Sequence, residues 1–252
     1  MSKLSKPPQP KKIPKTLIAH GDERIDDYYW LRDDTRKDPE VISYLEAENQ
    51  YLEDWFAVNN DCRQEIYKEL VSFIPSKEVS MKIKYGAYLY FSEITSDQQY
   101  KTYYRELDGN KELVLDVNTM AEGLEYFNIA SVVPSSDNLL IAYAEDLSGR
   151  REYNIKVKDL ASGEIIDNTI QNSSGSVVWD KQNTSIYYAQ KDPVTLIENK
   201  VFKHKLGTDA SEDILIYEEK DSEFHLSIYE SRTKKYLNIY ISALLIAAFI
   251  FL

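Results

Sequence analysis

The stretch that decides the fold is Tyr126–Ile166, YFNIASVVPSSDNLLIAYAEDLSGRREYNIKVKDLASGEII. It predicts four short strands separated by turns rich in Ser, Asp and Gly. These strands are Ile129–Val133, Leu139–Tyr143, Tyr153–Val157 and Glu164–Ile166. In the third of them apolar and polar residues alternate, which is typical of a half-buried strand. Four antiparallel strands joined by tight turns form one blade of a β-propeller.

The same pattern recurs along the chain at intervals of about 45–50 residues, the range of propeller blades. Further strands are predicted at Ser176–Asp180, Ser185–Tyr188, Lys200–His204, Ile214–Tyr217, Phe224–Ile228 and Tyr236–Tyr240. An earlier, weaker copy contains Tyr88–Phe91 and Lys101–Tyr104. The sequence therefore predicts a mainly β protein, a partial β-propeller of about three to four blades.

Residues 1–75 differ from the rest of the chain. Residues 1 to about 19 form a Pro- and Lys-rich arm, which favours an extended path. Asp38-Pro39-Glu40 predicts a helix start, because it offers a capping side chain, a first-turn proline and an acid. A second helix is predicted from about Asp61 to Phe73, and Pro75 ends it. We expect an α-helical N-terminal extension over 1–75 and the partial propeller over 76–242.

The tail, residues 243–252, is an apolar run that breaks the strand pattern. Counted from Ile239 the run is about 14 residues, whereas a helix needs about 20 to cross a bilayer. No basic residue follows it. We interpret this tail as the product of a truncation or a shifted reading frame, with a membrane anchor as the alternative.

Composition narrows the class of protein. A hydrophobic content of 43% is sufficient for a core and argues against global disorder. The net charge of −12 and the lack of a clustered basic face argue against nucleic-acid binding. An acidic surface favours solubility and can also attract basic peptides. The N-terminus has no apolar run that would indicate a signal peptide, so a cytoplasmic location is the default expectation.

Counting residues excludes most catalytic motifs. The glycines, at 21, 86, 109, 123, 149, 163, 175 and 207, are too far apart for G-x-S-x-G, G-x-G-x-x-G or a phosphate-binding loop. The histidines are isolated, so no H-E-x-x-H metalloprotease motif exists. With one cysteine, Cys62, neither a disulfide within the chain nor a cysteine-based zinc site is possible.

The remaining candidates each have a simpler structural interpretation. His20 lies in an entry loop, His225 opens a strand, and His204 lies between two lysines, where we expect it to face solvent. Glu218, Glu219, Asp221 and Glu223 form an acidic cluster that a solvated turn between blades explains. Cys62 is expected to be a buried or inert thiol rather than a nucleophile. We therefore assign no catalytic, cofactor-binding or metal-binding residue.

Two stretches carry a resemblance to a known family. His20–Asp33, HGDERIDDYYWLRD, resembles the N-terminal signature of the prolyl oligopeptidase family, in its oligopeptidase B (protease II) branch. Leu115–Ala121, Tyr126-Phe127, Ala142–Asp146 and Gly149–Tyr153 are similar to the first full blades of that branch. The resemblance runs almost without a gap from about Pro7 to about Ser242.

The resemblance implies a scaffold without its catalytic half. Full-length members have a seven-bladed propeller and an α/β-hydrolase domain, and their N-terminal arm and helices pack against the latter. The propeller admits only short peptides, and the oligopeptidase B branch cleaves after Arg and Lys. The catalytic triad and the acidic residues that bind the basic side chain lie in the C-terminal half. None of these residues can be carried over to this sequence.

Three hypotheses follow. The chain is the N-terminal portion of an oligopeptidase B-like serine peptidase, inactive alone and with a separate C-terminal hydrolase fragment as a candidate partner. Alternatively it is an independent propeller-type module that binds peptides or proteins, or a protein tethered to a membrane by its tail. The first is favoured, because a half ring exposes strand edges and the sequence shows little edge protection.

Overall fold

The computed structural model describes residues 6–243 and 247–251, and the chain divides into two compact units, Met1–Pro75 and Ser76–Leu252. The first unit contains β1 (Lys15–Ala19), β2 (Asp22–Asp26), the 3-10 helix η1 (Tyr29–Leu31), α1 (Pro39–Val58) and α2 (Asn60–Ser72). β1 lies in the predicted extended arm and β2 follows it, and the two form an antiparallel hairpin that the sequence pattern does not predict. His20 and Gly21 make its two-residue turn with φ of 51° and 82°, the left-handed backbone that such turns require.

Helix α1 begins where the sequence predicts. The Asp38 carboxylate accepts hydrogen bonds from the backbone N–H of Glu40 at 2.8 Å and of Val41 at 3.5 Å. Pro39 takes the first helical position, where its missing N–H costs nothing. Helix α2 ends at Ser72, one residue before the predicted end and three before Pro75.

Replacing Asp38 with Ala should loosen the first turn of α1. Loss of a capping side chain costs about 1 kcal/mol, which corresponds to about fivefold faster hydrogen exchange of the Glu40 and Val41 amides. The control is Glu53→Ala, an exposed position in the middle of the same helix. Equal exchange rates in both variants would show that the capping hydrogen bonds do not stabilise the helix.

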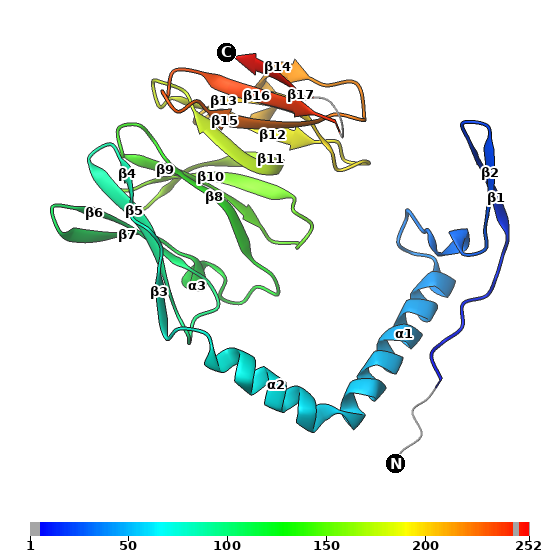
Figure 1. Cartoon of the computed structure of the whole chain (residues 1–252). Coiled ribbons are helices and arrows are strands. Elements are labelled where there is room, and N and C mark those ends of the chain that lie inside the picture. Colours follow the sequence, from blue (N-terminus) through cyan, green and yellow to red (C-terminus); the bar gives the residue numbers. More distant parts are fainter. Residues whose placement is uncertain (1–5, 244–246, 252) are drawn as a thin grey trace. The chain divides into compact units, whose positions relative to one another are not determined.

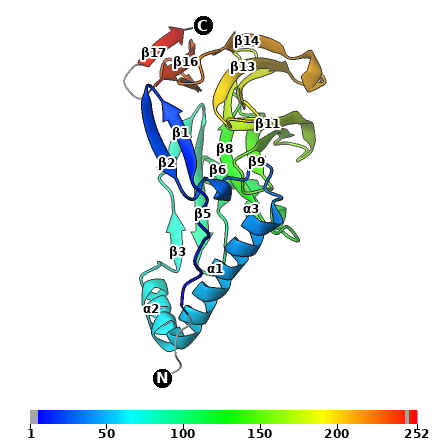
Figure 2. The same ribbon diagram turned by 90° about the vertical axis from the view of Figure 1, so that its right-hand side faces the viewer.

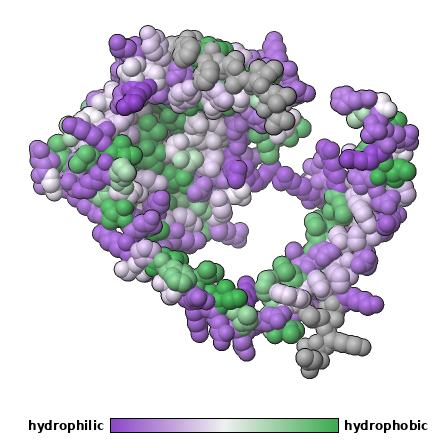
Figure 3. Space-filling view, in the orientation of Figure 1, coloured by the Kyte–Doolittle hydropathy of each residue, from purple (hydrophilic) through white to green (hydrophobic). Residues whose placement is uncertain are grey.

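Both helices expose apolar side chains. Among these are Leu45, Leu52 and Trp55 on α1 and Ile66 and Leu70 on α2, which are 41–60% exposed. In Figure 3 green, apolar atoms are visible on the surface of both helices. Within α1 only Val41 is buried among the described residues, so the unit lacks a core of the usual size.

The second unit is a succession of antiparallel sheets. In Figures 1 and 2 their colours follow the sequence from cyan through green and yellow to red. The first blade contains β3 (Lys77–Val79), β4 (Ile83–Tyr85), β5 (Tyr88–Thr95), β6 (Thr102–Leu107) and β7 (Asn110–Asp116). The short helix α3 (Val117–Met120) follows it.

The second and third blades share one seven-stranded sheet of order β14-β13-β12-β11-β10-β9-β8. The second blade contains β8 (Asn128–Pro134), β9 (Leu140–Asp146), β10 (Tyr153–Asp159) and the first half of β11 (Ile165–Trp179). The third contains the second half of β11, β12 (Ser185–Lys191), β13 (Glu198–Lys205), the 3-10 helix η2 (Ala210–Glu212) and β14 (Ile214–Glu218). All four strands predicted in Tyr126–Ile166 are confirmed.

Strand β11 differs from the expectation of two separate strands. The predicted strands Glu164–Ile166 and Ser176–Asp180 belong largely to one 15-residue strand, whose pairing with β12 shifts register between Ser173 and Val177. Gly175 lies at this shift with φ of 91°, a conformation that side chains disfavour. The bend lets one strand serve as the outer strand of the second blade and the inner strand of the third.

The fourth blade consists of β15 (His225–Glu230), β16 (Leu237–Ser242) and β17 (Ala247–Phe251) in that order. β17 lies in the apolar tail and pairs antiparallel with β16, from Asn238↔Phe251 to Ser242↔Ala247. The apolar run that breaks the strand pattern of the sequence therefore contributes a strand. A short apolar run without alternation is compatible with a strand, but periodicity alone does not identify it. Residues 244–246 and 252 of that tail lie outside the described residues.

Among the residues that the structure describes, the core consists of three apolar clusters, each between neighbouring blades. Alternate residues of one strand belong to different clusters: Ile141 and Tyr143 of β9 pack toward the first blade, and Ala142 and Ala144 pack toward the third. A third cluster joins β12 and β13 to the fourth blade. Because both faces of a blade are covered, each needs a neighbour on either side. This confirms the predicted partial propeller, and the described sheets do not close into a ring.

Candidate functional site

Two features of the second unit are candidates for function: its inner face and a buried histidine cluster. The inner face, as we use the term, is the row of turns β4–β5, β8–β9, β11–β12 and β15–β16, one in each blade. In all four blades this turn holds a residue in left-handed backbone, with φ of 61°, 62°, 56° and 57° at Gly86, Asn138, Asn183 and Lys234. Gly and Asn tolerate this conformation, whereas Lys does so less readily.

The asparagines at these turns link consecutive blades. The Arg105 guanidinium donates to the backbone oxygen of Asn138 at 2.6 Å, and the Tyr90 hydroxyl donates to its side chain at 3.0 Å. The N–H and hydroxyl of Ser136 both donate to the side-chain oxygen of Asn183 at 3.0 Å. Hydrogen bonds from one blade to the turn of the following blade therefore fix the spacing of the first three blades.

A cavity of about 420 Å³ lies beside the turn of the fourth blade. Its lining includes Tyr85, Trp179, Tyr187, Glu230, Lys234 and Tyr236. Lys234 stands over the Tyr85 ring, with Nζ at 3.1 Å from the ring centroid. Burial, with the nearby charge of Glu230, raises the pKa of Tyr85 to about 12, so its hydroxyl stays neutral at physiological pH. Aromatic rings and lysines in a concave surface suit a small polar ligand or a peptide.

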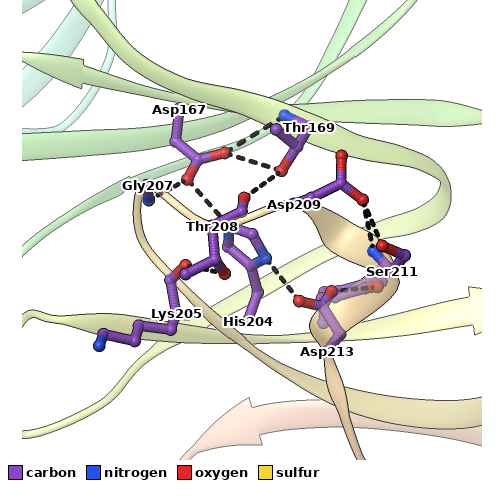
Figure 4. Close-up of polar contacts among 10 residues, drawn as sticks. Asp167, Thr169, His204, Lys205, Gly207, Thr208, Asp209, Ser211 and Asp213 are labelled. Atoms are coloured by element: carbon purple, nitrogen blue, oxygen red, sulfur yellow. Dashed lines mark hydrogen bonds and ion pairs between the residues drawn. The ribbon is translucent and has the colours of Figure 1, made fainter.

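The histidine cluster lies between the second and third blades. His204 on β13 is fully buried, so the prediction that it faces solvent is wrong. Its Nδ1 lies 2.6 Å from Asp213 Oδ1 and its Nε2 lies 2.9 Å from Asp167 Oδ2 (Figure 4). The flanking lysines indicate a solvated strand, but β13 lies inside a sheet that is covered on both faces, and the imidazole occupies the face of the buried cluster.

Each carboxylate of the cluster accepts further hydrogen bonds. Asp167 Oδ2 also accepts from the Gly207 N–H at 2.7 Å, and its Oδ1 accepts from the N–H and hydroxyl of Thr169 at 3.2 Å. Asp213 Oδ2 accepts from the Tyr188 hydroxyl at 2.8 Å. Since all these partners donate, both carboxylates act as acceptors, which is the role of the ionised form.

The cluster shifts the pKa values of its members. Burial lowers the pKa of His204, but its hydrogen bonds and charge interactions with Asp167 and Asp213 outweigh burial, so that the pKa is raised. Burial raises the pKa of Asp167, yet hydrogen bonds from His204, Gly207 and Thr169 bring it below its ordinary value. Burial and the bond to Asp213 raise the pKa of Tyr188. The hydrogen bonds and charges around His204 thus favour an imidazolium ion between two carboxylates.

This geometry does not support nucleophilic catalysis at His204. A histidine that activates a serine needs one ring nitrogen free to accept the hydroxyl proton. Both nitrogens of His204 are occupied by carboxylates, and the ring is closed to solvent. The cluster instead holds the first half of β11 against β13 and the segment around η2.

The other predicted candidates lie apart from this cluster. His20 occupies the β1–β2 turn, and His225 begins β15 with an exposed side chain. Of the acidic residues, Glu218 pairs with Lys200 at 3.5 Å, and Asp221 and Glu223 are exposed, in keeping with a solvated turn. Cys62 is exposed on α2, so burial is excluded for its thiol.

The sequence reasoning missed Asp167, Asp213 and Tyr188. Asp167 lies 37 residues before His204 in the chain, and Asp213 lies nine residues after it. No local motif connects positions so far apart. In the described part of the chain, no group of three or more His, Cys, Asp or Glu side chains is arranged to hold a metal ion. Among the same residues, no helix is long and apolar enough to cross a membrane.

Comparisons with known proteins agree with this architecture. Residues 7–248 match the family described as "Prolyl oligopeptidase, N-terminal beta-propeller domain". The chain is 35% identical to dipeptidyl aminopeptidase BI of Pseudoxanthomonas mexicana, over 92% of this chain and 35% of that protein. It is 34% identical to Protease 2 of Moraxella lacunata, over 94% of this chain and 35% of that protein. The chain thus spans about a third of the length of these relatives.

Solved structures extend the agreement to three dimensions. Oligopeptidase B from Leishmania major superposes with a TM-score of 0.90 at 31% identity, over 98% of this chain and 37% of that chain. Oligopeptidase B from Trypanosoma brucei gives 0.86 at 28% identity, over 98% of this chain and 37% of that chain. The successive blades, the buried faces between them and these matches show that the chain belongs to the prolyl oligopeptidase family, to whose N-terminal β-propeller domain it corresponds.

Proposed function

We propose that the chain serves as the propeller and N-terminal extension of an oligopeptidase B-like serine peptidase, which cleaves short peptides after Arg and Lys. The observation that carries this proposal is the match along 94% of the chain to Protease 2, of which it covers 35%. The 252 residues contain no nucleophile elbow, and the buried histidine is held by two carboxylates. We expect the chain to be inactive until a hydrolase domain is supplied.

The exposed apolar residues of α1 and α2 support the need for such a domain. Leu52 and Trp55 on α1 and Leu70 on α2 are 48%, 41% and 60% exposed. A helix pair that leaves this much apolar surface in water is typical of a segment that packs on a partner. The hydrolase domain expected from the family resemblance is the partner that we propose.

The test measures hydrolysis of a chromogenic peptide that ends in Arg. The purified chain alone should give no hydrolysis above that of a mock purification. Co-expression with the remaining C-terminal part of Moraxella Protease 2, about two thirds of that protein, should give a complex that co-purifies and cleaves the peptide. Hydrolysis by the chain alone would contradict the proposal.

A matched pair of variants locates the contact. Leu52→Glu places a charge on the exposed apolar surface of α1 and should abolish co-purification, because a buried unpaired carboxylate costs several kcal/mol. Glu53→Gln, on the neighbouring exposed position, should leave the complex intact. If both variants assemble equally well, the helices are not the interface. A chain that binds peptides at its inner face without any hydrolase partner would instead favour the independent binding module.

A further inference from the structure

The buried cluster of His204 joins two blades through groups that titrate. Asp167 comes from the outer strand of the second blade, whereas His204, Tyr188 and Asp213 come from the third. The side chains of His204, Asp167 and Asp213 are 0%, 2% and 2% exposed. Asp167 also accepts from Gly207 in the loop after β13, and Thr169 donates to the backbone oxygen of Thr208 at 3.3 Å. Two of these three contacts across the boundary thus pass through the Asp167 carboxylate, and one of the two comes from the His204 imidazole.

The number of protons on the imidazole determines whether His204 can form hydrogen bonds to both Asp167 and Asp213. A carboxylate only accepts hydrogen bonds, so each ring nitrogen of His204 must carry a proton to bond to its aspartate. A neutral imidazole has one N–H. When it loses a proton, one nitrogen directs a lone pair at a carboxylate oxygen that lies 2.6 or 2.9 Å away. That contact becomes repulsive, and a buried negative charge is left without its counter-ion.

We propose that His204, Asp167 and Asp213 form a pH-sensitive lock between the second and third blades. The lock is closed while the imidazole carries two protons and opens when it loses one to solvent hydroxide or buffer base. Opening separates the first half of β11 from the loop that follows β13, where Gly207 and Thr208 lie.

The ionisable groups that face the imidazole come from three parts of the chain. From η2 and its flanks come Asp213 and Asp209, from β11 comes Asp167, and from β12 comes Tyr188. The pKa of Asp209 is lowered mainly by its hydrogen bonds with Ser211 and also by the charge of His204. Lys203 and Lys205 project from β13 away from the cluster, and Lys203 pairs with Asp180 at 3.6 Å. The charges that face the ring are therefore negative, and they favour its protonated form.

The direction of the pH effect follows from these shifts. The pKa of His204 is raised on folding, so its contribution is complete below the ordinary value of about 6.5 and is lost as the pH rises through the raised pKa. The pKa of Asp167 is lowered on folding, so its contribution is present above about 3.9 and is lost as the pH falls through the lowered pKa. The lock is therefore closed at weakly acidic pH, between the lowered pKa of Asp167 and the ordinary pKa of histidine, and it opens as the pH rises through the raised pKa of His204.

Nuclear magnetic resonance of the full chain labelled with ¹⁵N histidine tests the proposal directly. The chain has three histidines, and the variants His20→Asn and His225→Gln assign two of them. Asn suits the left-handed backbone of residue 20. At about pH 6 both ring nitrogens of His204 should carry protons, and the ring should titrate above the value of about 6.5 found in unstructured peptides.

Hydrogen exchange of two amides reports whether the boundary opens. The Gly207 amide donates to Asp167 at 2.7 Å, and the matched Gly149 amide donates to Asp146 at 3.0 Å, in a turn without histidine. After correction for the intrinsic rate, protection of Gly207 should fall about tenfold for each pH unit between the ordinary and the raised pKa of His204. Protection of Gly149 should stay constant.

Four results would overturn the lock. The first is a single ring proton on His204 at about pH 6, and the second is a titration at or below that of the peptide. The third is constant Gly207 protection while His204 titrates, and the fourth is a ring that stays protonated throughout the alkaline range. Asp213→Asn should lower the pH at which His204 loses its proton, because it removes one of the two charges. If that variant does not fold, the wild-type measurements alone decide.

Discussion

Replacing His204 with Gln should lower the free energy of unfolding of the propeller unit by about 3–5 kcal/mol. The substitution keeps a polar side chain of similar length but removes the positive charge between Asp167 and Asp213. Two carboxylates would then share a buried site with one neutral amide donor group. Removing one partner of a buried ion pair is among the most destabilising changes known for a single site, since the remaining charge has no solvent to replace it.

The measurement is denaturant unfolding of the full chain, followed by tryptophan fluorescence at about pH 6, where the wild-type imidazole is charged. Trp179 reports on this region, because it packs in the same cluster as Tyr188, and its indole donates to the Val133 oxygen at 3.0 Å. His225→Gln is the control, since that side chain is exposed and should change stability by at most about 0.5 kcal/mol. A loss below about 1 kcal/mol in His204→Gln would show that the ion cluster does not hold the blades together.

Replacing Gly175 with Ala should lower the free energy of unfolding of the propeller unit by about 2–4 kcal/mol, the second largest loss that we predict. Its φ of 91° disfavours any side chain, and a Cβ there would lie 2.9 Å from both Ala130 Cβ and Tyr153 Cδ2. Tyr153 on β10 is buried in the core, so its ring cannot move without opening it. Ala130 on β8 is exposed, and its Cβ can move only with the backbone of that strand. The strain acts where β11 bends from one blade into the next.

Gly163→Ala separates the backbone penalty of a positive φ from the crowding around the added Cβ. Gly163 has a φ of 79°, but a Cβ added there would meet no heavy atom within 4 Å, so only the backbone penalty of about 1–2 kcal/mol applies. The difference in unfolding free energy between the two variants measures the crowding at the bend. Equal losses in both variants would mean that Ala130 and Tyr153 can adjust at little cost.

Both predictions concern the boundary between the second and third blades. At this boundary the structure shows contacts that the sequence patterns do not predict. Strand β11 crosses it as one chain segment, and the apolar cluster of Ile155, Ile170, Ile186 and their neighbours fills it. The His204 cluster lies at its polar edge. Apolar contacts supply attraction that depends little on pH, whereas the ion cluster fixes one geometry and adds the dependence on protons.

The sequence by itself determined the elements that depend on local patterns. Alternation located β10, turn residues separated β8 from β9, and the Asp38 cap with Pro39 placed the start of α1. These signals act over a few residues, so they can be seen without the fold. The spacing of the copies also gave the repeat, and the matching stretches gave the family.

Only the tertiary structure decided what each strand face contacts. His204 lies between two lysines, yet it is buried, because β13 is covered on both faces and its partners come from 37 residues earlier and nine residues later. The continuity of β11 likewise depends on a bend at Gly175 that two blades impose together. Burial and pairing between blades are properties of the assembled sheets, and the free energy that fixes them comes from contacts that no local stretch of sequence contains.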